Sequence, residues 1–174
     1  MTSYKEIVTK TVIGKSKKTT KDKVEIIPEQ LPSTVLGCWV INHMFNGNIS
    51  AGKGVVSGSY DVNVWYSYDE DHKTAVTQKT YNYTDEINVN VKNGSSLTNN
   101  SEIIVRSLKQ PTVSDVKIKG NEISLNIEKE LGVEIVGEDK IKVPIEDDED
   151  DYEEIIDDEE LDNVIEKIDP EYLK

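Results

Sequence analysis

The chain has one cysteine and two histidines among its 174 residues. A single cysteine, Cys38, cannot form an internal disulfide, which excludes the disulfide-stabilised secreted scaffolds and fits a reducing compartment. Cys38, His43 and His72 cannot by themselves supply a zinc site from three or four ligands. The acidic segment near the C-terminus lacks the glycine and spaced ligands of a dedicated calcium loop. We therefore expect no metal site and no cofactor.

Long apolar runs are also missing. No stretch approaches the roughly 20 apolar residues that a membrane-spanning helix needs. Residues 1–6 have no apolar run behind their charges, so we expect no secretory signal and synthesis in a cytoplasm. The net charge is −14, and the lysine-rich residues 1–23 lack arginine and interleaved aromatic residues. We therefore expect neither a membrane nor nucleic acid as a partner.

The sequence offers no convincing catalytic group. Strand alternation over residues 38–43 places Cys38 and His43 on opposite faces, which disfavours a thiol–imidazole pair. Residues 47–54 match the phosphate-binding pattern G-x-x-x-x-G-K-S/T up to Gly54, which stands where a hydroxyl is required. Strand patterns also lie on both sides of this segment, whereas the motif needs a helix after it. We interpret the segment as a hairpin loop and expect the protein not to be an enzyme.

The charge is divided unequally along the chain. Residues 146–174 contain 16 acids and two lysines, which account for the whole net charge of −14. Residues 1–145 contain 18 acids and 18 bases, so this body is neutral. A neutral body has little self-repulsion, whereas a dense acidic tail repels its own kind and attracts cationic partners. This division favours an assembling scaffold.

A second asymmetry lies at the N-terminus. Residues 1–23 carry seven lysines against two acids, a net charge of +5. Two interpretations stay open. The lysines could cover a solvated strand pair, or they could form a docking face for acidic segments such as the tail of a neighbouring copy.

The body has the two-residue periodicity of β-strands. Val62, Val64 and Tyr66 alternate with polar or bulky neighbours, and valine, isoleucine, threonine and tyrosine fill several similar runs. Glycine, asparagine and proline separate these runs. The pattern predicts an all-β domain over residues 1–145, an antiparallel β-sandwich or barrel-like domain of about ten strands. The expected strands lie near residues 4–13, 22–27, 35–43, 54–68, 74–83, 86–92, 101–109, 112–119, 122–136 and 139–145.

The acidic tail, residues 146–174, divides into two parts. Residues 146–157 are too charged to pack, so we expect them to be extended and disordered. Apolar residues at three-and-four spacing then predict a short amphipathic helix over residues 158–168. Its apolar stripe needs a surface to cover, on the body, on a sister subunit or on a client protein. The candidate partner-binding residues of the tail are Asp150, Asp151, Tyr152, Leu161, Val164, Ile165, Ile168 and Tyr172.

Aromatic residues and the cysteine supply candidates for self-assembly contacts. Tyrosines 60, 66, 68, 81 and 83 cluster in consecutive strands, where they either pack the sheet or form a stacked or oxidatively cross-linked interface. Cys38 is either a small buried apolar side chain or an intermolecular cross-link. The self-assembly candidates are Cys38, Trp39, Trp65, Tyr66 and Tyr68.

Several blocks of the sequence are long and unusual enough to identify a family. The segments YKEIVTK (residues 4–10), VLGCWVINH (35–43) and YDVNVWYSY (60–68) are the most specific. Residues 110–111, 134–138 and 169–173 extend the likeness almost from end to end. The sequence thus resembles the endospore outer-coat morphogenetic protein CotE family.

This resemblance implies a non-enzymatic scaffold of the spore coat, made in the mother-cell cytoplasm and assembled around the forespore. The family likeness implies a homo-oligomeric body, an acidic C-terminal region that recruits other spore coat proteins, and a basement-layer protein as anchor. It implies no catalytic residues. The alternative from the residues alone is a monomeric β-sandwich module that binds a small ligand or carbohydrate through a tyrosine-rich face.

Overall fold

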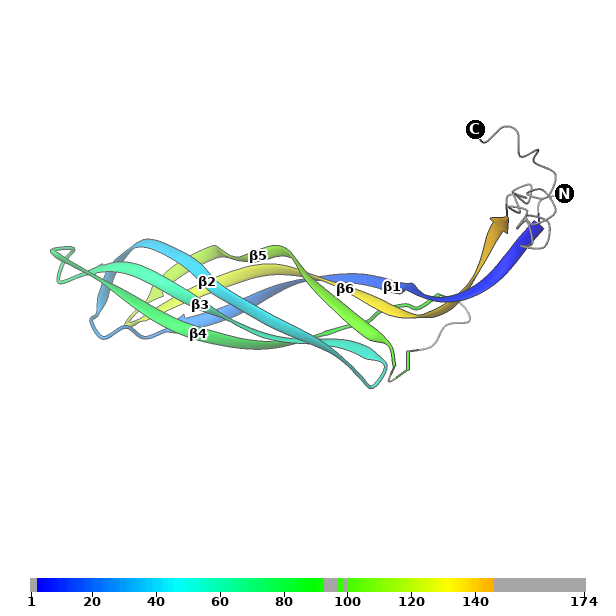
Figure 1. Cartoon of the computed structure of the whole chain (residues 1–174). Helices are drawn as coiled ribbons and strands as arrows, with labels where there is room; N and C mark the ends of the chain where they lie inside the picture. The colour runs from blue at the N-terminus through cyan, green and yellow to red at the C-terminus, as the bar shows by residue number, and fades with distance from the viewer. Residues whose placement is uncertain (1–2, 93–96, 99, 146–174) are drawn as a thin grey trace, which may run out of the picture. The chain divides into compact units, whose positions relative to one another are not determined.

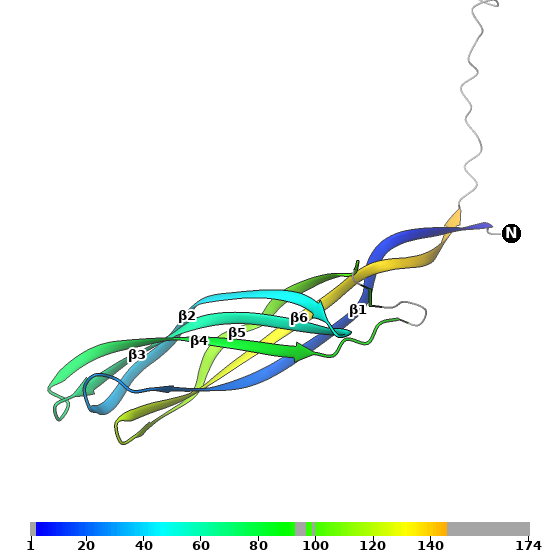
Figure 2. The same ribbon diagram turned by 90° about the horizontal axis from the view of Figure 1, so that it is seen from below.

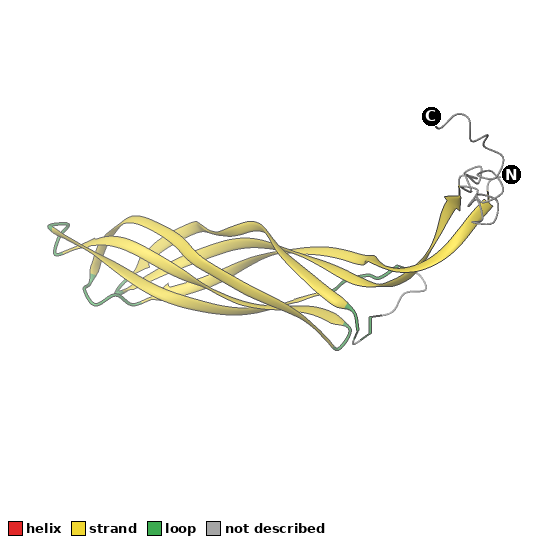
Figure 3. Ribbon diagram, viewed as in Figure 1, coloured by secondary structure: helices red, strands yellow, loops and turns green. Residues whose placement is uncertain are grey.

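The computed structural model describes residues 3–92, 97–98 and 100–145, and these contain strands, turns and loops but no helix (Figure 3). The tail residues, including the helix predicted over 158–168, lie outside the described residues. An all-β fold is therefore confirmed for the described body. The strands are β1 (Ser3–Ile26), β2 (Pro32–Ser50), β3 (Lys53–Tyr68), β4 (Lys73–Ile87), β5 (Glu102–Lys119) and β6 (Glu122–Ile145).

The strands form two three-stranded antiparallel sheets. One sheet has the order β1-β6-β5 and the other the order β2-β3-β4, so β6 and β3 are the central strands. Figures 1 and 2 show these sheets as two layers. Contacts divide the chain into a main unit, residues 6–141, and a second unit made of residues 1–5 and 142–174. All side-chain contacts described below belong to the main unit.

Six long strands replace the ten short strands that the sequence predicts. The predicted strands 4–13 and 22–27 are both parts of β1, because the supposed turn at Gly14 lies within the strand. Gly14 forms an isolated antiparallel bridge with Val91, and the Lys92 amide donates to the Ile13 carbonyl at 2.8 Å. A Cβ at Gly14 would lie 2.8 Å from the Asn90 backbone oxygen. The glycine therefore permits a close approach of two backbones and does not mark a turn.

The strand boundaries predicted in β4, β5 and β6 were also wrong. Predicted strands 101–109 and 112–119 are joined in β5, where Pro111 lies at a register shift between Lys109 and Thr112. Proline is tolerated there because β5 is an edge strand. Predicted strands 122–136 and 139–145 are likewise joined in β6. Only the first two residues of the predicted strand 86–92 are regular strand, since β4 ends at Ile87.

The hairpin predicted at residues 47–54 is confirmed, and a second tight hairpin joins β5 to β6. Ala51 and Gly52 connect β2 to β3 with φ values of 49° and 72°. Two successive positive φ values are the conformation that suits the twist of a two-residue hairpin. Residues 47–54 thus form a hairpin and no phosphate-binding loop. Gly120, with φ 63°, begins the equally short turn between β5 and β6.

The prediction that Cys38 and His43 lie on opposite faces was wrong. Between Ile41 and Met44 the register of β2 against β3 shifts by one residue, and Asn42 has φ 55°. Such a bulge reverses the alternation beyond it. His43 therefore points toward the core, where its ring centroid lies 6.2 Å from that of Tyr60.

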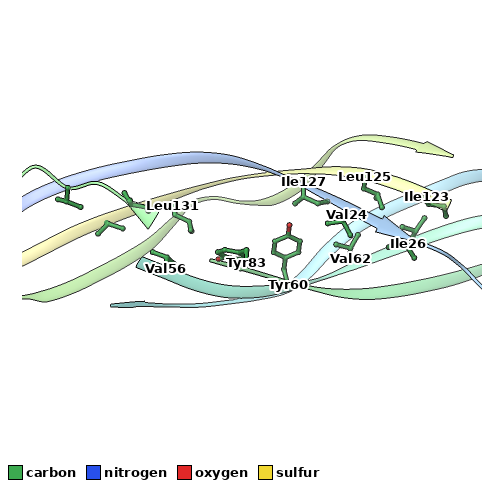
Figure 4. Packing of buried hydrophobic residues seen from close by; sticks show 14 of the residues in the cluster. Val24, Ile26, Val56, Tyr60, Val62, Tyr83, Ile123, Leu125, Ile127 and Leu131 are labelled. Carbon is green, nitrogen blue, oxygen red and sulfur yellow. The ribbon is translucent and has the colours of Figure 1, made fainter. Parts of the chain in front are cut away.

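The hydrophobic core lies between the two sheets and is built mainly by the inward faces of β3 and β6. Figure 4 shows Tyr60 pointing from β3 into the core toward Ile127. Burying one aliphatic side chain of this size contributes roughly 1.5–3 kcal/mol. The fully or nearly fully buried members from the two central strands are Val56, Tyr60, Val62, Val64, Tyr66, Ile123, Leu125, Ile127, Leu131, Val133 and Ile135.

No helix in the described part of the chain has the length and hydrophobicity that crossing a membrane would require.

Candidate assembly surface

Two exposed tryptophans lie close together on the outer face of the β2-β3-β4 sheet. In the strand register Trp65 lies opposite Gly37 on one side and Val76 on the other, while Trp39 lies opposite Asn63. Alternation then places Trp39 and Trp65 on the same face, on adjacent strands and offset by two residues. A Cβ at Gly37 would lie 3.8 Å from the Trp65 ring, which is an ordinary van der Waals contact.

We call this surface the tryptophan face and define it by Trp39, Ile41, Trp65 and Val76. Their exposed fractions are 42%, 43%, 43% and 57%, so four large apolar side chains are left facing solvent. Contiguous apolar surface of this kind is typical of interaction sites, and tryptophan is prominent among residues that dominate binding energy. The face contains no charged member, which lowers the desolvation cost of covering it.

A fixed polar group borders the tryptophan face. Asp61 lies opposite Ile41, and its carboxylate accepts hydrogen bonds from Asn42 Nδ2 at 2.8 Å and from Thr80 Oγ1 at 2.6 Å. These hydrogen bonds hold the pKa of Asp61 below its usual value. A polar rim around an apolar centre is the common anatomy of protein interfaces.

Cys38 lies beside the tryptophan face but not on it. The thiol is half-buried against the core, in a groove of about 530 Å³ between β2 and β5 that Trp39 and Pro111 also line. Burial raises the pKa of this thiol. A higher pKa lowers the fraction of thiolate, which is the form that reacts. The structure therefore favours the interpretation of Cys38 as a small packed side chain.

The two tyrosines among the self-assembly candidates lie on the core side of β3. Tyr66 is 1% exposed, and its hydroxyl donates to Gln30 Oε1 at 2.6 Å. Tyr68 is half-buried, with its ring centroid 6.3 Å from that of Tyr66. Tyr60 and Tyr83 are buried as well. Three of the five clustered tyrosines therefore pack the core, and they do not form the ligand-binding face of the alternative hypothesis.

The partner-binding candidates of the tail, from Asp150 to Tyr172, lie outside the described residues.

The lysines of β1 are largely paired within their own sheet. Lys10 Nζ lies 2.6 Å from the Glu102 carboxylate, and Lys15 Nζ lies 3.1 Å from that of Glu134. A third lysine, Lys17, approaches Glu130 at 3.6 Å. Exposed pairs contribute little to stability. They do reduce the positive potential of β1, which weakens the interpretation of this strand as a docking face for acid.

Sequence reasoning missed a polar cluster inside the core. Lys129 on β6 is fully buried, and its ammonium lies 2.7 Å from Asp22 Oδ2 and 3.2 Å from Asp85 Oδ2. The same nitrogen donates to Thr20 Oγ1 at 2.8 Å and lies 4.0 Å from the centroid of the Tyr83 ring. The sequence does contain a signal for this buried lysine. Strict alternation from Ile123 to Ile135 turns residue 129 inward.

Tyr83, whose ring lies beside the Lys129 ammonium, begins a hydrogen-bonded chain that continues through His43 to Gln110. The Gln110 Oε1 atom can only accept, so His43 donates to it from Nδ1 at 3.1 Å. The other ring nitrogen, Nε2, then accepts from the Tyr83 hydroxyl at 2.7 Å. Burial lowers the pKa of His43, and burial raises the pKa of Tyr83 to about 12. Both ring nitrogens are thus engaged, and neither serves a nucleophile.

Among the described residues, no group of three or more His, Cys, Asp or Glu side chains is placed to hold a metal ion. What the residues do form is a sheet face suited to protein contacts. Comparison with curated proteins gives no match, and comparison with solved structures gives none either. A family model, that of outer spore coat protein E (CotE), matches residues 3–174. The chain therefore belongs to the outer spore coat protein E family, and it is a structural morphogenetic protein of the outer spore coat and not an enzyme.

Proposed function

We propose that the body, residues 1–145, assembles with copies of itself through the tryptophan face, and that the acidic tail recruits other coat proteins. The observation that carries the first part is the exposure of Trp39 and Trp65 side by side on adjacent strands. Family membership supplies the coat as the setting. The assembled bodies would form the layer, and the tails would present sites to client proteins and to a basement-layer anchor.

A second copy of the chain suits the tryptophan face for two reasons. The body carries 18 acids and 18 bases, so two bodies approach without long-range repulsion. A face that meets its own copy about a two-fold axis needs only one self-complementary patch. Repeated weak contacts along a layer then add through multivalency.

The tail suits a different kind of partner. Its 16 acids within residues 146–174 attract cationic surfaces and repel other tails. The lysines of β1 already lie near acids of β5 and β6, which favours clients over a neighbouring body as the partners of the tail. The tail therefore adds recruitment without taking part in the contact between bodies.

Light scattering over a concentration series tests the assembly contact. We expect the full chain to grow in molar mass with concentration, and the double variant Trp39→Ser with Trp65→Ser to stay smaller. Losing one interface hot spot typically costs about 2 kcal/mol, or roughly thirtyfold in affinity. Leu108→Ser is the matched control, since Leu108 is an exposed apolar residue on β5, in the other sheet. Equal assembly by the double variant and the control would refute the contact.

Deleting residues 146–174 tests recruitment separately. We expect the shortened chain to assemble as before but to lose capture of purified coat proteins that the full chain binds. Capture by the full chain should weaken with salt, because the Debye length falls from about 10 Å at 0.1 M to about 3 Å at 1 M. Unchanged capture after deletion, or capture that resists salt, would remove the tail from the proposal.

A further inference from the structure

The buried Lys129 carries chemistry that the assembly function does not use. Its side chain is 0% exposed, and the side chains of Asp22 and Asp85 are only 11% and 12% exposed. The ammonium therefore lies between two carboxylates in a space that excludes water. A primary amine fixed against a carboxyl group without water is the arrangement from which an amide bond can form.

Three different strands hold the three groups in place. Asp22 lies on β1 and Lys129 on β6 in one sheet, whereas Asp85 lies on β4 in the other. Each follows the inward alternation of its strand, so the backbone directs all three side chains into the core. Figure 4 shows that Tyr60 and Tyr83, which flank the cluster, occupy the space between the sheets. This fixed placement supplies the proximity that a slow condensation requires.

The two carboxylates differ in their partners. Asp22 Oδ2 accepts hydrogen bonds from Lys129 Nζ at 2.7 Å and from the Tyr60 hydroxyl at 2.8 Å. Burial raises the pKa of Tyr60, so its hydroxyl keeps its proton and remains a donor. Asp85 Oδ2 is buried 3.2 Å from the ammonium and accepts no hydrogen bond from the described residues. Asp22 is thus positioned to move protons, and Asp85 is free to be attacked.

We propose that Lys129 and Asp85 form an intramolecular isopeptide bond, with Asp22 as the proton carrier. The bond would join β6 to β4 and therefore tie the two sheets together through the core. It would also constrain the unfolded chain, as any cross-link between distant residues does.

The step balances without any further reactant. The Lys129 ammonium gives one proton to the Asp22 carboxylate, and the neutral amine then attacks the Asp85 carboxyl carbon. A carbon–nitrogen bond forms, and one carbon–oxygen bond of Asp85 breaks. The departing oxygen receives the proton held by Asp22 and a second proton released by the nitrogen, and it leaves as water. The nitrogen keeps one proton as an amide, and Asp22 returns to its carboxylate form. Nothing is oxidised or reduced.

The mass of the denatured, purified full chain tests this inference directly. We expect it to be lower than the sequence mass by one water molecule. Proteolysis should yield one branched peptide that contains both Lys129 and Asp85. The full sequence mass in the wild-type chain would overturn the proposal, and so would a branch at Asp22.

Variants test the roles of the residues. Lys129→Arg and Asp85→Ala should each restore the full sequence mass, and Asp22→Asn should slow or abolish the loss of water. Lys109→Arg is the matched control, because Lys109 is an exposed lysine of β5 paired with Glu128 at 2.9 Å, and it should retain the loss. A loss of water that persists in Lys129→Arg would place the dehydration elsewhere and refute the assignment. The mass of the wild-type chain tests the proposal by itself. The test therefore remains valid even if one of the variants fails to fold.

Discussion

At the residue scale, the packing around two strand glycines decides whether a larger side chain can replace them. Gly14 lies where a Cβ would be 2.8 Å from both the Asn90 oxygen and a Val89 methyl carbon. Gly37 differs, because a Cβ there would make an ordinary contact with Trp65 at 3.8 Å. Both glycines lie inside strands. What distinguishes them is how closely the neighbouring atoms approach.

Gly14→Ala should therefore lower the free energy of unfolding by about 1–3 kcal/mol, which is the usual cost of overpacking. Gly37→Ala should leave it unchanged or raise it by up to about 1 kcal/mol, since alanine loses less chain entropy on folding. Urea unfolding monitored by circular dichroism measures both. Equal effects of the two substitutions would contradict the role assigned to Gly14.

A second residue-scale prediction concerns pH. Burial lowers the pKa of His43, so the folded protein holds this ring neutral over a range in which the unfolded chain protonates it. The unfolded state then binds more protons as pH falls below about 6.5, and stability must fall with it. Stability should therefore be lower at pH 5.5 than at pH 7.5. The measurement is urea unfolding at the two pH values.

His43→Gln should reduce this dependence on pH, whereas His72→Gln should preserve it. His72 is exposed in the turn after β3, where its Nδ1 lies 2.8 Å from the Asp69 carbonyl oxygen. An identical pH dependence in the two variants would show that His43 does not contribute.

At the scale of the elements, the β2–β3 hairpin holds a non-glycine residue in an unfavourable conformation. Ala51 has φ 49°, where asparagine and glycine are preferred and alanine is strained. Ala51→Asn should raise the free energy of unfolding by up to about 1 kcal/mol, and Gly52→Ala should lower it by a similar amount. Thermal unfolding measures both. A loss of stability with Ala51→Asn would contradict the turn geometry.

The sequence predicts the type of these elements better than their extent. Alternation identified the all-β fold, and the glycines of residues 47–54 indicated the hairpin between β2 and β3. Two of the predicted strand divisions were wrong because Gly14 and Pro111 resemble breaks, yet one permits backbone contact and the other occupies an edge strand. Local sequence does not reveal which strand will become an edge or where a second backbone will approach.

The candidate site was only partly predictable for similar reasons. Alternation within β3 separates exposed Trp65 from buried Tyr66. The bulge at Asn42 was not visible in the sequence, so His43 was placed on the wrong face. Lys129 could have been found, since it occupies an inward position in an uninterrupted alternating run, but a lysine is so often exposed that the pattern was overlooked.

At the scale of the whole molecule, the neutral body and the acidic tail differ in the force through which each could bind a partner. Under the proposed function, contact between bodies would depend on apolar burial, whereas the acidic tail would act through charge. Trp39 and Trp65 are the only tryptophans in the chain, and both lie on the tryptophan face. Intrinsic tryptophan fluorescence therefore reports on this surface and on no other.

The most direct measurement follows tryptophan emission and light scattering together while the full chain is concentrated. We expect the emission to shift to shorter wavelength and acrylamide quenching to fall as the molar mass rises, because both indoles leave water. Growth in molar mass with no change in emission or quenching would contradict this expectation, since the bodies would then be meeting through another surface.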